Sequence, residues 1–156
     1  MASVRFPAAF LSVSFLSIAV AAAQPVLPED PVSLLGMTPA QAMALLGPPV
    51  RVYAVRGAEP WQDDVAFDFG GGLALFFYAD RVWQVGVSVP YALPVLGFVL
   101  GADVERASAV LGTPVLVLDG AVEWDLPGAD WPVRLRGLVD ASGRIVTTLY
   151  LYRADF

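Results

Sequence analysis

Short runs of apolar residues, bounded by Gly, Pro or Asp, recur along most of this chain. Such runs of four to eight residues, rich in Val, Phe, Leu and Tyr, are typical of strands. The expected strands are Val50–Val55, Val65–Phe69, Leu73–Tyr78, Val82–Val89, Val115–Leu118, Ala121–Asp125, Val133–Val139 and Ile145–Tyr152. Turn signals such as Gly70-Gly71-Gly72 and Ser142-Gly143 separate them, so neighbouring strands should pair as antiparallel hairpins.

Two other segments have the features of short helices. Thr38 and Asp103 can accept the free amide hydrogens of a first helical turn, and Gln41 can complete a capping box with Thr38. Gly47 and Gly112 can end these helices in the left-handed conformation. The sequence therefore predicts two helices of about nine residues each, over 38–46 and 103–111.

The two helical segments also resemble each other in sequence. A shift of 65 residues aligns 36–52 with 101–117, and eight of the 17 positions are then identical without a gap. We therefore expect an α+β fold of two tandem helix-then-antiparallel-strand repeats, forming one sheet of up to eight strands with helices on one face. The expected domains are a signal peptide at 1–23, a first repeat at 24–92 and a second repeat at 93–156.

The first 23 residues have the pattern of a secretory signal peptide. Arg5 is followed by an apolar run from Ala8 to Val20 and then by Ala21-Ala22-Ala23, a small-residue pattern that suits signal peptidase. A membrane anchor is the alternative, but the run has about 13 residues, and a helix needs about 20 to span a bilayer. We expect cleavage after Ala23 or a neighbour, no stable membrane anchor afterwards, and a periplasmic or secreted protein.

Composition excludes several kinds of chemistry. The chain has no His, no Cys and no Lys, and its nine basic residues are all Arg. A conventional zinc site, a Ser-His-Asp or Cys-His nucleophile and a Walker-A phosphate loop each need one of the missing residue types. The formal charge of −6 makes nucleic acid an unfavourable partner. We therefore expect no cofactor, no metal and no catalysis.

The first helical segment carries a motif that is known elsewhere. Residues 36–49 read Gly-Met-Thr-x-x-Gln-Ala-x-x-Leu-Leu-Gly-x-Pro, and strands with a hairpin at Gly143-Arg144-Ile145 come later. This pattern resembles the tandem modules of β-lactamase inhibitory protein and the small SmpA/OmlA-type lipoproteins of outer-membrane assembly. The resemblance implies a non-catalytic, exported protein-binding module with an open sheet face. Without Cys, the chain lacks the lipid-anchoring Cys of the lipoproteins and the disulfides of the inhibitor.

The hairpin at Gly143 predicts which side chains share a face of the sheet. A three-residue loop there would place Leu135 opposite Leu149 and Val133 opposite Leu151 on a core face. The other face would carry Arg, which can pair with an acidic group of a partner, and aromatic side chains, which dominate binding hot spots. The expected residues for binding a protein partner are Phe76, Tyr78, Trp83, Arg134, Arg136, Tyr150 and Tyr152; Val85, Val87 and Thr148 should share their face.

Two alternatives stay open. The aromatic face could be a second, small core covered by the Pro-rich N-terminal segment or by loops. Alternatively, carboxylates could serve a glycoside hydrolase or hold calcium, while Trp61, Trp124 and Trp131 stack on the rings of a bound sugar. The carboxylates concerned are Asp63, Asp64, Asp68, Asp119, Glu123 and Asp125, although solvated turns and strand ends explain them better.

Overall fold

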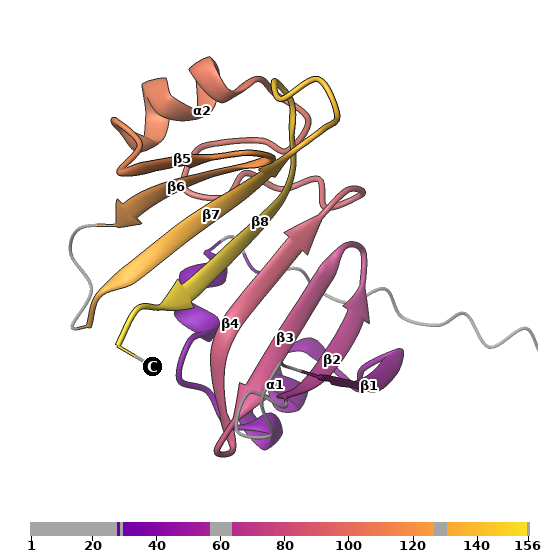
Figure 1. Ribbon diagram of the computed structural model, residues 1–156. Helices are drawn as coiled ribbons and strands as arrows, with labels where there is room; N and C mark the ends of the chain where they lie inside the picture. The colour runs from indigo at the N-terminus through magenta and orange to yellow at the C-terminus, as the bar shows by residue number, and fades with distance from the viewer. Residues whose placement is uncertain (1–27, 29, 57–63, 127–130, 156) are drawn as a thin grey trace, which may run out of the picture.

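The fold is given by a computed structural model, which describes residue 28 and residues 30–56, 64–126 and 131–155. Its main feature is one antiparallel sheet of eight strands in the order β1-β2-β3-β4-β8-β7-β6-β5 (Figure 1). The strands are β1 (Arg51–Val55), β2 (Asp64–Gly70), β3 (Leu73–Tyr78), β4 (Arg81–Ser88), β5 (Leu116–Leu118), β6 (Ala121–Leu126), β7 (Val133–Val139) and β8 (Val146–Arg153). Each expected strand is confirmed to within one residue at either end.

The helices of the described residues are few and short. They are the 3-10 turn η1 (Pro31–Leu34) and the α-helices α1 (Pro39–Leu46) and α2 (Val104–Leu111). None of them has the length and apolar character that crossing a membrane requires.

The predicted helix caps are confirmed. Thr38 and Gln41 form the reciprocal capping box, and the Asp103 side chain accepts the amide hydrogen three residues further on at 2.7 Å. Gly47 and Gly112 follow the last helical residues with φ angles of 82° and 92°, which a residue with a Cβ rarely adopts. Local hydrogen bonding at both ends therefore limits each α-helix to eight residues.

The expected fold class, two tandem helix-then-strand repeats, is wrong. The molecule is mostly one antiparallel sheet, and the two α-helices of its described part are short additions to that sheet. The physical reason is that β4 pairs directly with β8, so that Val87 lies opposite Leu149 and the backbone hydrogen bonds continue from one half of the chain into the other. The boundary at residue 92 stays a prediction, and the expected signal peptide at 1–23 lies outside the described residues.

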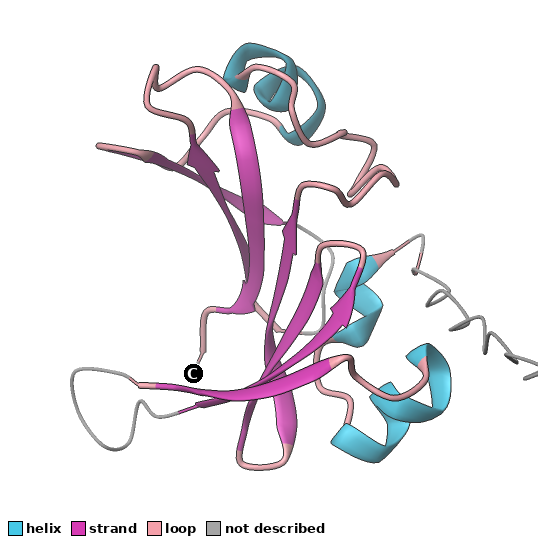
Figure 2. Ribbon diagram, turned by 90° about the vertical axis from the view of Figure 1, so that its right-hand side faces the viewer, coloured by secondary structure: helices cyan, strands magenta, loops and turns pink. Residues whose placement is uncertain are grey.

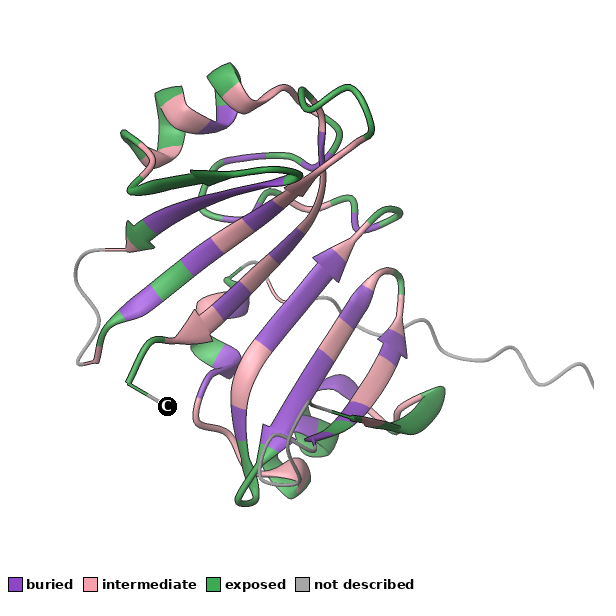
Figure 3. Cartoon of the chain, in the orientation of Figure 1, coloured by how far each residue is buried: buried purple, intermediate pink, exposed green. Residues whose placement is uncertain are grey.

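The sheet is bent, and its two faces differ. Figure 2 shows the helices on the convex side, whereas no described helix lies over the concave side. The side chains of the convex side form the core, and Figure 3 shows their burial along the central strands. Fully buried members of this core are Leu73, Leu75, Val82, Val85, Val87, Trp124, Leu135, Leu149 and Leu151.

The part of the Pro-rich N-terminal segment that the structure describes packs into this core. Leu34 and Leu35 are buried. The Gly36 amide donates to the Val82 carbonyl at 2.7 Å, and the Val82 amide donates to the Met37 carbonyl at 2.9 Å. Residues 30–37 therefore run along the core side of β4, so this part of the N-terminal segment does not cover the concave face.

The expected register of the last hairpin is wrong by two residues, although the expected faces are right. Leu135 lies opposite Leu151, not Leu149. The Asp140 carboxylate accepts the Ile145 amide hydrogen at 3.1 Å, and the Asp140 amide donates to the Ile145 carbonyl at 2.9 Å, which lengthens the loop by one residue. A bulge in the β7–β8 pair adds the second residue. Because side chains alternate with a period of two, a shift of two keeps each on its face.

A bulge in the β3–β4 pair changes the expected faces of β4. Trp83 is the extra residue, opposite the step from Phe76 to Phe77. A shift of one residue moves the following side chains to the other face of the sheet. Val85 and Val87, which we expected beside Trp83 on the aromatic face, are therefore buried in the core.

Candidate functional site

We call the concave side of the sheet the open face. The strand registers place on it the side chains, or for glycine the Cα, of Arg51, Tyr53, Asp64, Asp68, Ala74, Phe76, Gln84, Gly86, Ser88, Thr148, Tyr150, Tyr152, Arg134, Arg136, Glu123 and Asp125. In the middle of the face, Tyr150 lies between Gly86 and Arg136, and Tyr152 lies between Gln84 and Arg134. These cross-strand rows place the aromatic and Arg side chains of the second half next to β4 of the first half.

The Arg side chains in these rows are paired within the chain. Arg136 donates from Nε to Glu123 Oε1 at 2.6 Å, and its Nη2 forms an ion pair with the same oxygen. Arg134 Nε lies 3.1 Å from Asp125 Oδ1, and this hydrogen bond raises the pKa of Arg134. We expected that these Arg residues could pair with an acidic group of a partner; in the structure, Asp125 and Glu123 already balance their charges on the face itself.

Tyr152 belongs to the same cluster. Burial raises its pKa above the ordinary value of 10.0, and the charge of Glu123 raises it further, while Arg136 and Arg134 oppose the shift. The Glu123 side chain is only 3% exposed, so its contact with Arg136 balances the charge of a buried carboxylate.

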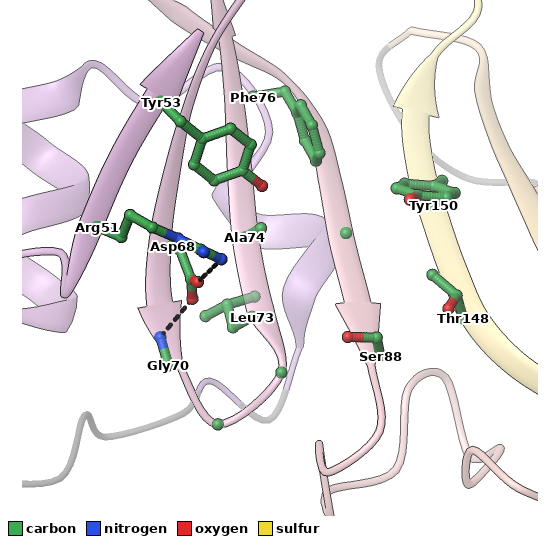
Figure 4. A pocket seen from close by; sticks show the side chains of 13 residues that line it. Arg51, Tyr53, Asp68, Gly70, Leu73, Ala74, Phe76, Ser88, Thr148 and Tyr150 are labelled. Atoms are coloured by element: carbon green, nitrogen blue, oxygen red, sulfur yellow. Dashed lines mark hydrogen bonds and ion pairs between the residues drawn. The ribbon is translucent and has the colours of Figure 1, made fainter. Parts of the chain in front are cut away.

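Two hollows are present on the open face. The aromatic hollow has a volume of about 490 Å³ and is drawn in Figure 4. Its lining residues are Arg51, Tyr53, Asp68, Gly70, Gly71, Gly72, Leu73, Ala74, Phe76, Gly86, Ser88, Thr148 and Tyr150. The arginine hollow has a volume of about 340 Å³ and is lined by Trp83, Gln84, Arg136, Leu138, Tyr150 and Tyr152. Tyr150 contributes to both.

The aromatic hollow exists because its floor is made of small residues. Ala74 and Gly86 are cross-strand neighbours between Asp68 on one side and Tyr150 on the other. A Cβ on Gly86 would lie 3.1 Å from Tyr150 Cε1 and 3.2 Å from Phe76 Cε2. The missing side chain thus leaves room for the two rings, whose centroids are 6.1 Å apart at an interplanar angle of 67°. This is the edge-to-face arrangement that aromatic pairs favour.

The opposite side of this hollow is polar. Arg51 Nη2 lies 2.9 Å from Asp68 Oδ2, and Asp68 Oδ1 accepts the Gly70 amide hydrogen at 2.9 Å (Figure 4). The Arg51 guanidinium carbon is also 5.2 Å from the centroid of the Tyr53 ring. The hollow therefore combines aromatic walls with a charge-balanced ion pair.

The expected partner-binding residues are not all in one place. Trp83, Arg136, Tyr150 and Tyr152 line the arginine hollow, while Phe76 and Tyr150 line the aromatic hollow. Arg134 lines neither hollow, although it neighbours Tyr152. Tyr78 lies apart at the end of β3, where it lines a different hollow together with residues of the core side of β2.

Trp83 is also less free than the sequence suggested. Its indole N–H donates to Asp64 Oδ2 at 3.1 Å, and Asp64 is buried. The bulge at Trp83 therefore positions the ring next to the open face while its polar edge faces β2.

Sequence reasoning missed Arg51, Tyr53, Ala74 and Gly86 of the aromatic hollow, and it considered Asp68 only as a carboxylate for hydrolysis or calcium. The alternation of β1 could have placed Arg51 and Tyr53 on one face. It could not show that this face is the one that Tyr150 shares, because that depends on the pairing of β4 with β8.

The tryptophans expected for sugar stacking are differently placed. Trp124 is fully buried in the core and donates its indole N–H to the Gly112 carbonyl at 3.1 Å, so it cannot contact a sugar. Trp131 is half-buried, with the Arg153 guanidinium 4.7 Å from its ring centroid. Trp61 lies outside the described residues.

The carboxylates proposed for hydrolysis or calcium are mostly engaged. Asp68, Glu123 and Asp125 pair with Arg residues, and Asp64 accepts the Trp83 hydrogen bond. Asp119 is exposed, and Asp63 lies outside the described residues. Within the described part of the chain, no three or more acidic side chains are grouped so as to hold a metal ion.

The fold and the face together define an open-faced antiparallel sheet protein. No protein-family model and no curated protein matches the sequence. Two solved structures are similar in fold. One is a cysteine-rich secretory protein from Staphylococcus aureus subsp. aureus Mu50, with a TM-score of 0.54 and 12% sequence identity. The other is an extracellular protein containing a SCP domain from Bacillus anthracis str. Ames, with a TM-score of 0.53 and 9% sequence identity. The matches cover 85% and 92% of this chain but 46% and 50% of those chains. This chain thus spans about half of their length, and the likeness is one of fold.

Proposed function

We propose that this chain is an exported, non-catalytic protein-binding or envelope-assembly module, which binds its partner through the open face. The observation that carries the proposal is a concave sheet face without a described helix over it, on which aromatic and Arg side chains surround two hollows. Aromatic and Arg side chains beside pockets are typical of binding hot spots. Of the residues expected from the sequence, those proposed to contact the partner here are Phe76, Trp83, Arg134, Arg136, Tyr150 and Tyr152; Tyr78, at the end of β3, lines a different hollow.

Hydrogen bonds within the face support binding as its role. Arg136 is held by Glu123, and Trp83 is held by Asp64. Side chains that are already ordered lose less rotamer entropy when a partner arrives, which favours affinity. Folding has already restricted the rotamers of these two side chains, so binding does not have to restrict them again.

Export is the second part of the proposal. It is supported by the signal-peptide pattern of residues 1–23 and by the descriptions of the two similar structures, one as a secretory and one as an extracellular protein. The resemblance to β-lactamase inhibitory protein and to SmpA/OmlA-type lipoproteins points to the same kind of role.

A sugar-binding or hydrolytic role is the competing proposal. The aromatic hollow is the feature that favours it, because aromatic rings beside polar groups also suit a sugar ring. We rank it second, since the carboxylates at this hollow and next to the arginine hollow are paired with Arg51 and Arg136.

Capture of a partner tests the proposal. The chain is immobilised and exposed to envelope and secreted proteins of its own organism, and bound proteins are identified by mass spectrometry. We expect Tyr150→Ala and Arg134→Ala each to weaken specific capture about tenfold or more, because truncating hot-spot residues costs about 2 kcal/mol or more. Leu45→Ala is the control, since Leu45 is exposed on α1, on the other side of the sheet. Capture that does not depend on Tyr150 or Arg134 would contradict the proposal.

A further inference from the structure

The floor and the walls of the aromatic hollow restrict what it can hold. Its floor is Ala74 and Gly86, which leave an open volume of about 490 Å³. Its walls include the edge-to-face pair of Phe76 and Tyr150, with the Tyr53 ring across the floor from Tyr150 (Figure 4). An occupant that fills this space therefore contacts ring surfaces on more than one side.

The charge of the hollow is balanced before anything binds. Arg51 and Asp68 form an ion pair at 2.9 Å, and both line the hollow. A cationic occupant would compete with Arg51 for Asp68, and an anionic one would compete with Asp68 for Arg51. Because each of these two charges already has its partner, the pair offers no unpaired charge to attract a charged occupant, and an uncharged occupant fits the hollow better.

Hydroxyl groups at the hollow favour an occupant with a polar tip. Ser88 and Thr148 are cross-strand partners at one end of the floor, and both line the hollow. Within the described part of the chain, their side-chain hydroxyls take part in no hydrogen bond. A ring that brings its own N–H or O–H could use these hydroxyls, which a purely apolar ring could not.

We propose that the aromatic hollow is an anchor site for one tyrosine or tryptophan side chain that projects from the partner protein. Such a side chain is uncharged, gains edge-to-face contacts with Phe76 and Tyr150, and carries the polar group that Ser88 and Thr148 can meet. The concave shape of the open face suits a projecting segment of a partner. The inference rests on the proposed protein-binding function and adds the identity of the anchoring residue.

A titration followed by NMR tests the anchor site without the partner. The ¹⁵N-labelled full chain is titrated with N-acetyl-L-tyrosinamide and N-acetyl-L-tryptophanamide, and we expect saturable shifts of the Ala74, Gly86 and Tyr150 amides. N-acetyl-L-leucinamide should bind with an affinity at least about tenfold lower than that of either aromatic amide. Absence of saturable shifts, or shifts centred elsewhere, overturns the proposal. Equal or tighter binding of methyl β-glucopyranoside overturns it in favour of a sugar site.

Variants of the chain separate this inference from the proposed function. Ala74→Leu fills the floor and should weaken binding of the aromatic amides about tenfold. Tyr53→Ala removes a wall of the hollow at the edge of the sheet. It should also weaken binding of the aromatic amides, and it replaces Ala74→Leu in the test if that variant does not fold. Gln84→Leu, in the arginine hollow, is the matched control and should leave the titration unchanged.

The same variants are then used in the capture assay. If Tyr150→Ala weakens capture while Ala74→Leu and Tyr53→Ala do not, the open face binds a partner and the anchor site is wrong. If the amides bind but no captured protein depends on the open face, the protein-binding function is wrong and so is the assignment of a partner side chain.

Discussion

At the scale of single residues, the open face combines aromatic surface with charges that the chain itself satisfies. The clearest case is Glu123, a carboxylate that is buried although it belongs to the concave side. A buried carboxylate is stable only with a good partner, and here Arg136 both donates a hydrogen bond to Glu123 and balances its charge. The rings and guanidinium groups of this cluster are therefore positioned by electrostatics as well as by packing.

The raised pKa of Tyr152 makes a prediction about stability in alkaline solution. A group with a raised pKa in the folded state stabilises the fold below its unfolded pKa, near 10.0, and this contribution is lost as pH rises through the folded value. Tyr152→Phe cannot ionise, so its free energy of unfolding should fall less than that of the parent chain between about pH 9 and 11. Urea denaturation at several pH values in this range measures the free energy of unfolding of both proteins. An equal fall in the two free energies would contradict the prediction.

At the scale of elements, small irregularities decide what the strands present. One extra residue, Trp83, moves Val85 and Val87 from the open face into the core. In the last hairpin, two irregularities add up to a shift that leaves the faces unchanged. The turn after β2 is equally specific, because Gly72 lies against the backbone of Ser88 and accepts its amide hydrogen bond at 2.8 Å.

Gly72 of this turn and Gly120 of the turn between β5 and β6 form a matched pair for substitution. Gly72→Ala would place a Cβ 2.0 Å from the Ser88 carbonyl oxygen at a φ of +85°, whereas Gly120→Ala has a φ of +78° and no neighbour within 4 Å. Gly120→Ala should cost about 1–2 kcal/mol from backbone strain, and Gly72→Ala should cost more than about 4 kcal/mol, because the strand ends must separate. Similar losses in urea denaturation would show that contact with Ser88 does not matter.

At the scale of the whole molecule, the β4–β8 pair joins the two halves into one sheet with one core. Val87 and Leu149 meet at this junction, and both are fully buried. The same junction places Tyr150 beside Gly86, so the aromatic hollow draws on strands from both halves. The stability of the fold and the shape of the face therefore depend on the same strand pair.

Leu149→Ala tests this dependence. The cavity at the junction should cost about 2–5 kcal/mol, and unfolding should stay a single cooperative transition because the core is shared. Val117→Ala, at a position 71% exposed on the edge strand β5, is the control and should change stability by less than about 0.5 kcal/mol. Calorimetry that resolved two separate transitions would show that the halves unfold independently.

Much of the local structure could be predicted from the sequence alone. The strands at 73–78 and 133–139 and the helices that follow Thr38 and Asp103 form where the pattern placed them. These features depend on neighbouring residues: side-chain alternation makes a strand, a capping side chain begins a helix, and a glycine ends it. Side-chain alternation also placed Tyr150, Tyr152, Arg134 and Arg136 correctly on one face. The expected pairing of β7 with β8 differed from the observed register by two residues.

Only the tertiary structure decided which strands meet and what they form together. Several decisive features join residues that are far apart in the sequence. They are the bulge at Trp83, the junction of β4 with β8, and the ion pairs of Arg51 and Arg136. Alternation specifies the two faces of a strand, but it does not specify the residue across from it, because one inserted residue or one longer loop changes every partner. For this reason the sequence determined the elements and most of their faces, whereas the single sheet and its two hollows follow from long-range pairing.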